Sequence, residues 1–215
     1  MTIGVIDYGM GNLGSVISAF RFLDVECRIV SVQREFTGLS GVFLPGVGSF
    51  GKAMQNLRSK DLIHPMEEAV FERKIPFMGI CLGMQLMGRS SEESGGVAGL
   101  GWIDADITLV APDRREDKSI IRPHVGWNEV EIKDAKCPLF QRIETGDMTY
   151  FDHEFQMEVL PGVTAASSNY HGEFSSVVQQ GHIFGVQSHP EKSQRTGLIM
   201  LRNFSNLCRK QLGLE

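Results

Sequence analysis

The feature that most constrains this chain is the run Gly79-Ile80-Cys81-Leu82-Gly83, which separates an apolar run (75–78) from an amphipathic stretch. A Gly-x-Cys-x-Gly motif between a strand and a helix is the cysteine form of the nucleophile elbow, whose glycines permit a tight, strained turn. Such a turn lifts one side chain above the sheet edge and places it at a helix N-terminus, which favours a negatively charged nucleophile. The motif therefore predicts an α/β chain with a reactive cysteine, Cys81.

Apolar and amphipathic segments alternate in the first half of the chain, which predicts a mostly parallel sheet with helices on both faces. Strands are expected over Thr2–Ile6, Cys27–Val32, Val42–Leu44 and Ile75–Ile80. Helices are expected over Asn12–Leu23, Phe50–Leu57 and Asp61–Glu72, the last disturbed near Pro65.

The second half changes to shorter strands with alternating polarity, which predicts an additional antiparallel region. The expected strands are Ile107–Val110, Trp127–Ile132, Thr149–Phe155, Val163–Ser167, Ser175–Gln179 and Ile183–Gln187. A closing helix is expected over Gln194–Leu212, and the mixed charges of 112–118 indicate a solvated loop.

Composition narrows the class of protein. At 215 residues the chain is expected to form one domain, 1–215. A net charge of -5 disfavours nucleic acid or an anionic membrane as a partner. The N-terminus lacks a basic leader and no long apolar run occurs, so a cytoplasmic protein is expected. The four cysteines show no CxxC spacing, so reduced thiols are expected.

A second segment supplies the groups that a nucleophilic cysteine needs. His189-Pro190-Glu191 follows an apolar strand, and Glu191 is near enough in sequence to orient the imidazole of His189. A base held by a carboxylate is the arrangement that activates a cysteine or serine nucleophile. Cys81 alone could equally be an inert core residue, as Cys27 and Cys208 are expected to be. The distant His and Glu favour a Cys81-His189-Glu191 acyl-transfer site.

Two glycine-rich segments suggest other functions. The run from Gly9 to Gly14 is a literal GxGxxG between strand and helix, with Glu35 near the distance of a ribose-binding carboxylate, and this pattern is typical of nucleotide-binding oxidoreductases. The run from Gly46 to Ala53 is close to a P-loop, but Ala53 lacks the hydroxyl that would ligate magnesium. The same turn could instead present backbone N–H groups as half of an oxyanion hole.

Together these motifs resemble those of class I glutamine amidotransferases, and within them the glutaminase subunits of imidazole glycerol phosphate synthases. The resemblance covers nearly the whole chain. It rests on the segments Asp7–Leu13, Leu44–Gly48, Gly79–Gln85, Pro123–Asn128, Tyr150–His153 and Gly185–Ser193.

The resemblance implies a class I glutamine amidotransferase (flavodoxin-like) fold, no cofactor or metal, and hydrolysis of glutamine to glutamate and ammonia. It implies Cys81 as nucleophile, with His189 and Glu191 completing the triad. The backbone N–H groups of Val47 and Leu82 would form the oxyanion hole. Residues that would bind the substrate are Gly46, Gly48, Gln85, Glu93 and His153.

The resemblance also implies a partner, because the chain is too short to carry a second domain that consumes ammonia. In the family this partner is a (β/α)8-barrel cyclase, which forms a heterodimer with the glutaminase and channels ammonia to a ribonucleotide in histidine biosynthesis. Asn12, Trp127 and Lys192 match positions that face the cyclase or its ammonia entrance.

Several residues depart from the family pattern. Glu154-Phe155 stand where a small hydroxyl residue and a tyrosine are usual, and Ser188 and Val125 replace a usual Phe and Met. A paralogue that feeds ammonia to a related synthase, such as one that amidates a sugar, fits these departures as well. An oxidoreductase that uses the 9–14 loop and a non-catalytic regulatory module are the remaining alternatives.

Overall fold

The sheet at the centre of the protein begins with short, mainly apolar strands that run parallel to one another. The computed structural model describes residues 1–160 and 162–213. Its largest sheet has the order β2-β1-β3-β4-β14-β13-β12-β9, in which β2 to β14 are parallel. The parallel strands are β1 (Ile3–Ile6), β2 (Cys27–Val30), β3 (Gly41–Leu44), β4 (Phe77–Ile80) and β14 (Ile183–Val186).

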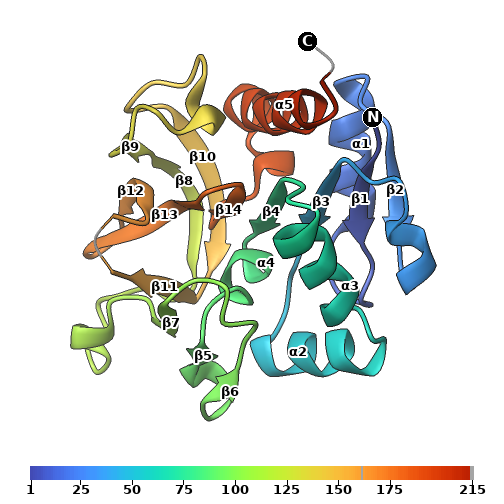
Figure 1. Ribbon diagram of the computed structural model, residues 1–215. Coiled ribbons are helices and arrows are strands. Elements are labelled where there is room, and N and C mark those ends of the chain that lie inside the picture. Colours follow the sequence, from blue (N-terminus) through green and yellow to red (C-terminus); the bar gives the residue numbers. More distant parts are fainter. Residues whose placement is uncertain (161, 214–215) are drawn as a thin grey trace.

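Helices cover both faces of this sheet, as the alternating pattern predicts (Figure 1). On one face, α1 (Leu13–Phe22) and α5 (Gln194–Gln211) bury Phe20 and Phe204 against Phe43 of β3. The other face is covered by α2 (Phe50–Ser59), α3 (Ile63–Glu67), a π-helical turn (Glu68–Glu72) and α4 (Leu82–Gln85). The expected parallel α/β architecture is confirmed.

The strands of the second half pair mainly in the antiparallel direction. In the large sheet the antiparallel strands are β13 (Glu173–Gln180), β12 (Thr164–Asn169) and β9 (Glu131–Ile132). A two-stranded sheet pairs β8 (His124–Glu129) with β10 (Met148–His153), and a four-stranded sheet has the order β11-β7-β5-β6. Its strands are β11 (Phe155–Val159), β7 (Ala105–Leu109), β5 (Ser90–Ser91) and β6 (Val97–Ala98). As an exception to the antiparallel pairing, β7 pairs parallel with β5.

Two of the expected strands prove to be two strands each. The segment 149–155 changes sheets at Glu154: β10 pairs with β8, whereas β11 pairs with β7. The segment 127–132 is likewise divided between β8 and β9. A hydrophobic pattern predicts which residues are buried, but it does not predict that two parts of one segment pair with different strands.

Local geometry corrects one further expectation. The helix expected from Asp61 begins at Ile63, because Asp61 has a φ of 52° and therefore cannot be helical. Cys137 lies in an irregular segment and is buried beside the 3-10 turn Pro138–Phe140. The loop 112–118 begins with a 3-10 turn over Pro112–Arg114.

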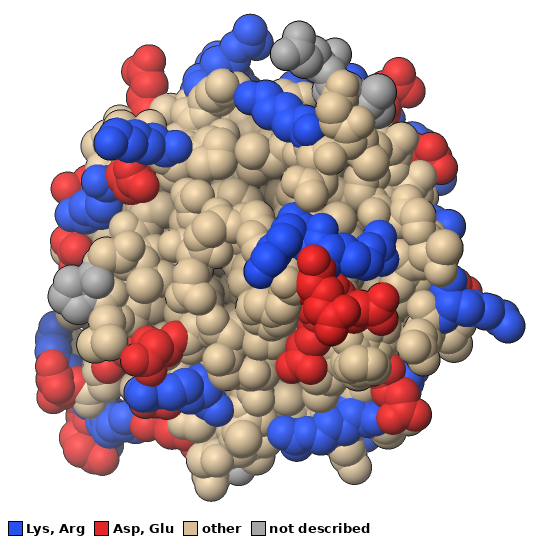
Figure 2. Space-filling view, viewed as in Figure 1, with Lys and Arg blue, Asp and Glu red and all other residues tan. Residues whose placement is uncertain are grey.

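The surface carries charges of both signs. Figure 2 shows basic and acidic side chains interspersed over one face, with wide uncharged areas between them. Among residues 1–160 and 162–213, no helix has both the length and the apolar character needed to cross a bilayer.

Candidate active site

Cys81 occupies the strained turn that the Gly-x-Cys-x-Gly motif predicts. It lies between β4 and α4 with φ 50° and ψ -113°, and its backbone N–H donates to the Val186 carbonyl at 2.7 Å. A Cβ atom on Gly79 would overlap the Gly83 carbonyl, and one on Gly83 would overlap the Leu44 carbonyl. Both glycines are therefore required by close backbone packing, which holds Cys81 in its strained conformation.

His189 lies at the same sheet edge as Cys81, because the strands that deliver them are neighbours. β4 and β14 are parallel, with Ile80 paired to Val186, so the chain after each strand emerges on one side. His189 N–H donates to the Tyr150 carbonyl at 2.8 Å, which fixes the turn after β14.

Glu191 orients the imidazole. Nδ1 of His189 lies 2.8 Å from Oε1 of Glu191, and each side chain is only 2% exposed. Burial alone would lower the pKa of His189, but its interactions with Cys81 and Glu191 outweigh burial and raise that pKa to about 10. The predicted base and its orienting carboxylate are thus in contact, and the base retains its proton at neutral pH.

Two atoms of this pair are buried without a hydrogen-bond partner of standard geometry among the described residues. They are Nε2 of His189 and Oε2 of Glu191. A buried polar atom without a partner is costly, and such atoms in a site are ready for a reacting group. Nε2 is the ring atom that is left for proton transfer, since Nδ1 is engaged by Glu191.

A cavity of about 320 Å³ opens over Cys81 and collects most of the predicted substrate-binding residues. Its lining consists of Val47, Gly48, Cys81, Leu82, Gln85, Glu93, Asp152, His153, Glu154 and Phe155. Gly46 does not line it. A Cβ on Gly46 would lie 2.6 Å from the Tyr8 hydroxyl and 2.8 Å from Gly83 N, so Gly46 packs the 44–48 turn against the elbow.

Gln85 and Glu93 are partly engaged by the protein itself. The side-chain amide of Gln85 donates to the Phe155 carbonyl at 2.7 Å and to Oε1 of Gln187 at 3.2 Å, which leaves its own oxygen as an acceptor. Glu93 Oε2 accepts from Phe50 N at 2.8 Å and so caps α2. Both residues are thereby held rigidly at the cavity.

Sequence reasoning missed two buried residues that contact the residues lining the cavity. Gln187, which is fully buried, lies with Nε2 3.8 Å from Cys81 Sγ and links the thiol to Gln85. His124 is buried with its Nδ1 3.0 Å from Nε2 of His153. Both belong to motifs that carry the resemblance, but neither shows a spacing that signals a role by itself.

The three residues expected at a partner interface fall into two places. Trp127 is 43% exposed and packs edge-on against Tyr150 with ring centroids 6.0 Å apart, while Lys192 Nζ lies 5.7 Å from the same ring. Asn12 caps α1 through Ser15 N at 3.2 Å and lines a groove between α1 and α5.

The glycine-rich alternatives have local structural explanations. Glu35 accepts from the backbone N–H groups of Ser31 and Val32, so its carboxylate closes its own turn, η1 (Gln33–Phe36). Ala53 is fully buried in α2, and Lys52 donates to Gln55 at 3.2 Å. These contacts provide no nucleotide-binding arrangement.

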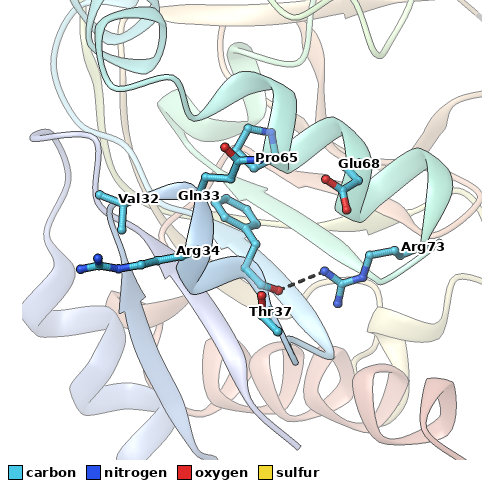
Figure 3. A pocket seen from close by; sticks show the side chains of 8 residues that line it. Val32, Gln33, Arg34, Thr37, Pro65, Glu68 and Arg73 are labelled. Carbon is cyan, nitrogen blue, oxygen red and sulfur yellow. Dashed lines mark hydrogen bonds between the residues drawn. The ribbon is translucent and has the colours of Figure 1, made fainter.

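A larger cavity, of about 610 Å³, lies between η1 and the segment from α3 to Arg73, and it shares no lining residue with the cavity over Cys81. Figure 3 shows Arg73 directed across the cavity toward η1, where its guanidinium donates to the Phe36 carbonyl at 3.0 Å. The guanidinium also donates to the Leu39 carbonyl at 3.0 Å. None of the predicted site residues lines it. Residues 1–160 and 162–213 contain no group of three or more His, Cys, Asp and Glu side chains that could hold a metal ion.

The elbow turn at Cys81 and the parallel sheet are typical of cysteine-dependent acyl-transfer enzymes, and a buried His–Glu contact is the arrangement expected beside such a nucleophile. Residues 4–207 match the family "Glutamine amidotransferase class-I", and the chain belongs to that family of glutamine amidotransferases, whose nucleophile is a cysteine. Its relatives include the imidazole glycerol phosphate synthase subunit HisH of Moorella thermoacetica, which is 42% identical over 212 residues (96% of this chain and 95% of the relative). Subunit HisH 1 of Campylobacter jejuni is 39% identical, over 95% of this chain and 100% of the relative.

Solved structures share the fold at low identity. The crystal structure of a glutamine amidotransferase has a TM-score of 0.73 at 17% identity, over 96% of this chain and 98% of that one. PurLQS from Thermotoga maritima has a TM-score of 0.70 at 18% identity, over 95% of this chain and 97% of that one. The predicted class I glutamine amidotransferase fold is confirmed.

Proposed function

We propose that the chain acts as one glutaminase domain, in which Cys81, His189 and Glu191 hydrolyse glutamine to glutamate and ammonia. The observation that carries this proposal is the elbow geometry of Cys81 beside the buried His189–Glu191 contact of 2.8 Å. A nucleophile, a base and an orienting carboxylate at one sheet edge are the components that amide hydrolysis through a thioester requires.

In the first half-reaction Cys81 Sγ attacks the side-chain amide carbon of glutamine. The resulting tetrahedral oxyanion collapses to a thioester, and protonated His189 gives its Nε2 proton to the departing ammonia. In the second half-reaction neutral His189 takes a proton from water, which attacks the thioester and releases glutamate. Glu191 holds the ring in the orientation that both steps need.

Two backbone N–H groups are proposed to stabilise the oxyanions. Leu82 N begins α4 directly after the nucleophile, and Val47 lies in the adjacent turn that lines the same cavity. A single oxyanion donor contributes about 3 kcal/mol in comparable sites. The Gln85 oxygen and Glu93 would bind the α-ammonium of glutamine, while Gly46 supports the turn that carries Gly48 and His153 lines the remaining wall.

We further propose that the ammonia serves a separate cyclase subunit, with which this chain forms a heterodimeric imidazole glycerol phosphate synthase. The support is that the relatives are named as subunits of that synthase and match this chain nearly end to end. The cyclase is proposed to be a (β/α)8 barrel that makes imidazole glycerol phosphate and AICAR in the cytoplasm. Asn12, Trp127 and Lys192 are proposed to face it.

A paralogous role remains the second candidate, in which the ammonia goes to a related synthase such as one that amidates a sugar. The observation that favours it is the wall of the cavity, where exposed Glu154 and half-buried Phe155 replace the usual hydroxyl residue and tyrosine. Purified chain mixed with the cyclase subunit of its own organism decides between these roles. Glutamine-dependent formation of imidazole glycerol phosphate supports the histidine pathway, and its absence supports the paralogous role.

The central test is Cys81→Ala. We expect this variant to fold as the wild type does, to lose glutamine hydrolysis, and to escape labelling by a glutamine-analogue electrophile. Cys27→Ala is the matched control, since Cys27 lies in β2 away from the cavity, and it should retain both properties. Hydrolysis that survives in folded Cys81→Ala would disprove the mechanism.

A further inference from the structure

The histidine pair at the cavity wall joins the antiparallel half of the molecule to the active site. His124 of β8 and His153 of β10 are directly paired across the strands, and their rings meet through Nδ1 of His124 and Nε2 of His153 at 3.0 Å. His153 Nδ1 lies 2.9 Å from the carbonyl oxygen of Phe155. The pair thus connects β8 to the residues that line the cavity.

The chemistry of the acceptor fixes where the protons are. A carbonyl oxygen only accepts, so His153 must carry its proton on Nδ1, and Nε2 of the neutral ring is then an acceptor. His124 must therefore donate from its own Nδ1. Burial lowers the pKa of His124 to about 4 and that of His153 to about 3, so both rings are neutral when they form this chain of bonds.

This chain of hydrogen bonds ends at the Phe155 carbonyl oxygen, which also accepts a hydrogen bond from a residue that lines the cavity. The Phe155 carbonyl accepts from His153 at 2.9 Å and from Gln85 at 2.7 Å, so one atom joins β11, the histidine pair and α4. Gln85 in turn donates to Gln187. Because His153, Glu154 and Phe155 line the cavity, whatever fixes this oxygen also fixes the cavity wall.

His124 itself is held from both sides and does not line the cavity. Its ring stacks between Phe151 and Tyr170, with centroids 4.9 Å and 4.0 Å away, and its Nε2 lies 3.5 Å from Asn128 Nδ2. A buried donor that is clamped in this way costs little entropy when it holds its acceptor in place.

We propose that His124 is a positioning residue, which acts through His153 to hold the substrate-facing wall of the glutaminase cavity in its binding geometry. This inference rests on the proposed function. The backbone of Cys81 is fixed by its own glycine-bounded turn and by Val186, although its thiol also lies 3.7 Å from the Asp152 carbonyl. Loss of the His124 donor should therefore weaken substrate binding more than it slows chemistry.

Two substitutions separate the donor from the stacked ring. His124→Phe keeps an aromatic ring between Phe151 and Tyr170 but removes the donor, whereas His124→Asn places an amide N–H near Nδ1 and removes the ring. We expect His124→Phe to raise KM for glutamine about tenfold with kcat changed less than twofold, which corresponds to the loss of one buried hydrogen bond. His124→Asn should keep KM within about threefold and lower Tm.

Further readouts exclude a purely structural effect. Alkylation of Cys81 by iodoacetamide should proceed at the wild-type rate in His124→Phe, since the elbow is untouched. His182→Phe, which removes a hydrogen bond to Val70 distant from the cavity, should leave KM unchanged. Equal KM in His124→Phe and wild type, or an equal rise in KM in His124→Phe and His124→Asn, would overturn the inference. Absence of Cys81-dependent hydrolysis in the wild type would instead overturn the proposed function.

Discussion

The two halves of the molecule build the site in different ways. The parallel half delivers Cys81 and His189 from adjacent strands whose register is fixed by backbone hydrogen bonds. The antiparallel half builds the cavity wall from the end of β10 and the start of β11, and β8 supports this wall through His124, which is distant in sequence from His153. Reactivity is therefore set by local turns, whereas substrate fit depends on long-range packing.

The largest effect is expected in the parallel half, from Gly83→Ala. Its new Cβ would overlap the Leu44 carbonyl, so either the elbow or β3 must move. We expect a loss of about 3 kcal/mol or more in the free energy of unfolding, together with loss of glutaminase activity. Urea unfolding and the labelling of Cys81 measure the two effects. Wild-type values for both would show that the elbow tolerates a side chain there.

Glu191→Gln tests whether Glu191 contributes to reactivity, as the parallel half is expected to do, or to substrate binding, as the antiparallel half is expected to do. The substitution removes the negative charge that helps to raise the pKa of His189, so the ring loses its proton more readily. We expect kcat to fall at least about 100-fold, the scale of general acid–base catalysis, with KM little changed. Glu129→Gln, at an exposed position of β8, serves as the control and should be neutral. A rise in KM for glutamine with kcat unchanged would instead indicate that Glu191 acts in substrate binding, as the residues of the cavity wall are proposed to do.

Acid should weaken the antiparallel half first. In the unfolded chain His124 and His153 become protonated below about pH 6.5. In the folded chain both stay neutral until the pH falls to their lowered pKa values of about 4 and about 3. This contribution to stability is present above pH 6.5 and declines between pH 6.5 and 4, by up to about 2.7 kcal/mol per pH unit for the pair. Urea unfolding at several pH values measures the slope. His124→Phe should flatten it, and an unchanged slope would contradict the assignment.

The smallest expected effect, with the opposite sign, comes from Gly14→Ala. Gly14 lies in the first turn of α1 at an ordinary φ, and the atom nearest to its new Cβ would be Asn12 Oδ1 at 3.9 Å. Alanine should stabilise the helix by up to about 1 kcal/mol. Tm should rise slightly and activity should be retained. Lost activity would instead give the 9–14 loop a functional role.

The difference between the halves also explains what the sequence could predict. The elbow, the His189–Glu191 contact and the parallel strands depend on spacing and glycines that lie within single short segments. By contrast, the division of 149–155 into β10 and β11 depends on which strand each part pairs with. His124 and Gln187 become recognisable only when strands from distant parts of the chain bring them beside His153 and Cys81.

The same reasoning applies to the residues that are proposed to bind the substrate. Gln85, Glu93 and Gly48 were predicted from the resemblance, and the structure places all three in the cavity lining. Gly46 was predicted with them but packs behind the cavity, against Tyr8. A motif identifies a turn, but it does not specify which residue of the turn faces the substrate.

The pairing of β4 with β14 determines which parts of the enzyme can unfold locally. Both strands are fully buried at the centre of the sheet, so their amide hydrogens should exchange with solvent only when the whole protein unfolds. The two-stranded sheet of β8 and β10 lies outside that sheet, but Tyr150 of β10 accepts a hydrogen bond from His189 N at 2.8 Å. Opening of this smaller sheet would therefore loosen the cavity wall and the turn that carries His189 together, while Cys81 stays fixed at the end of β4.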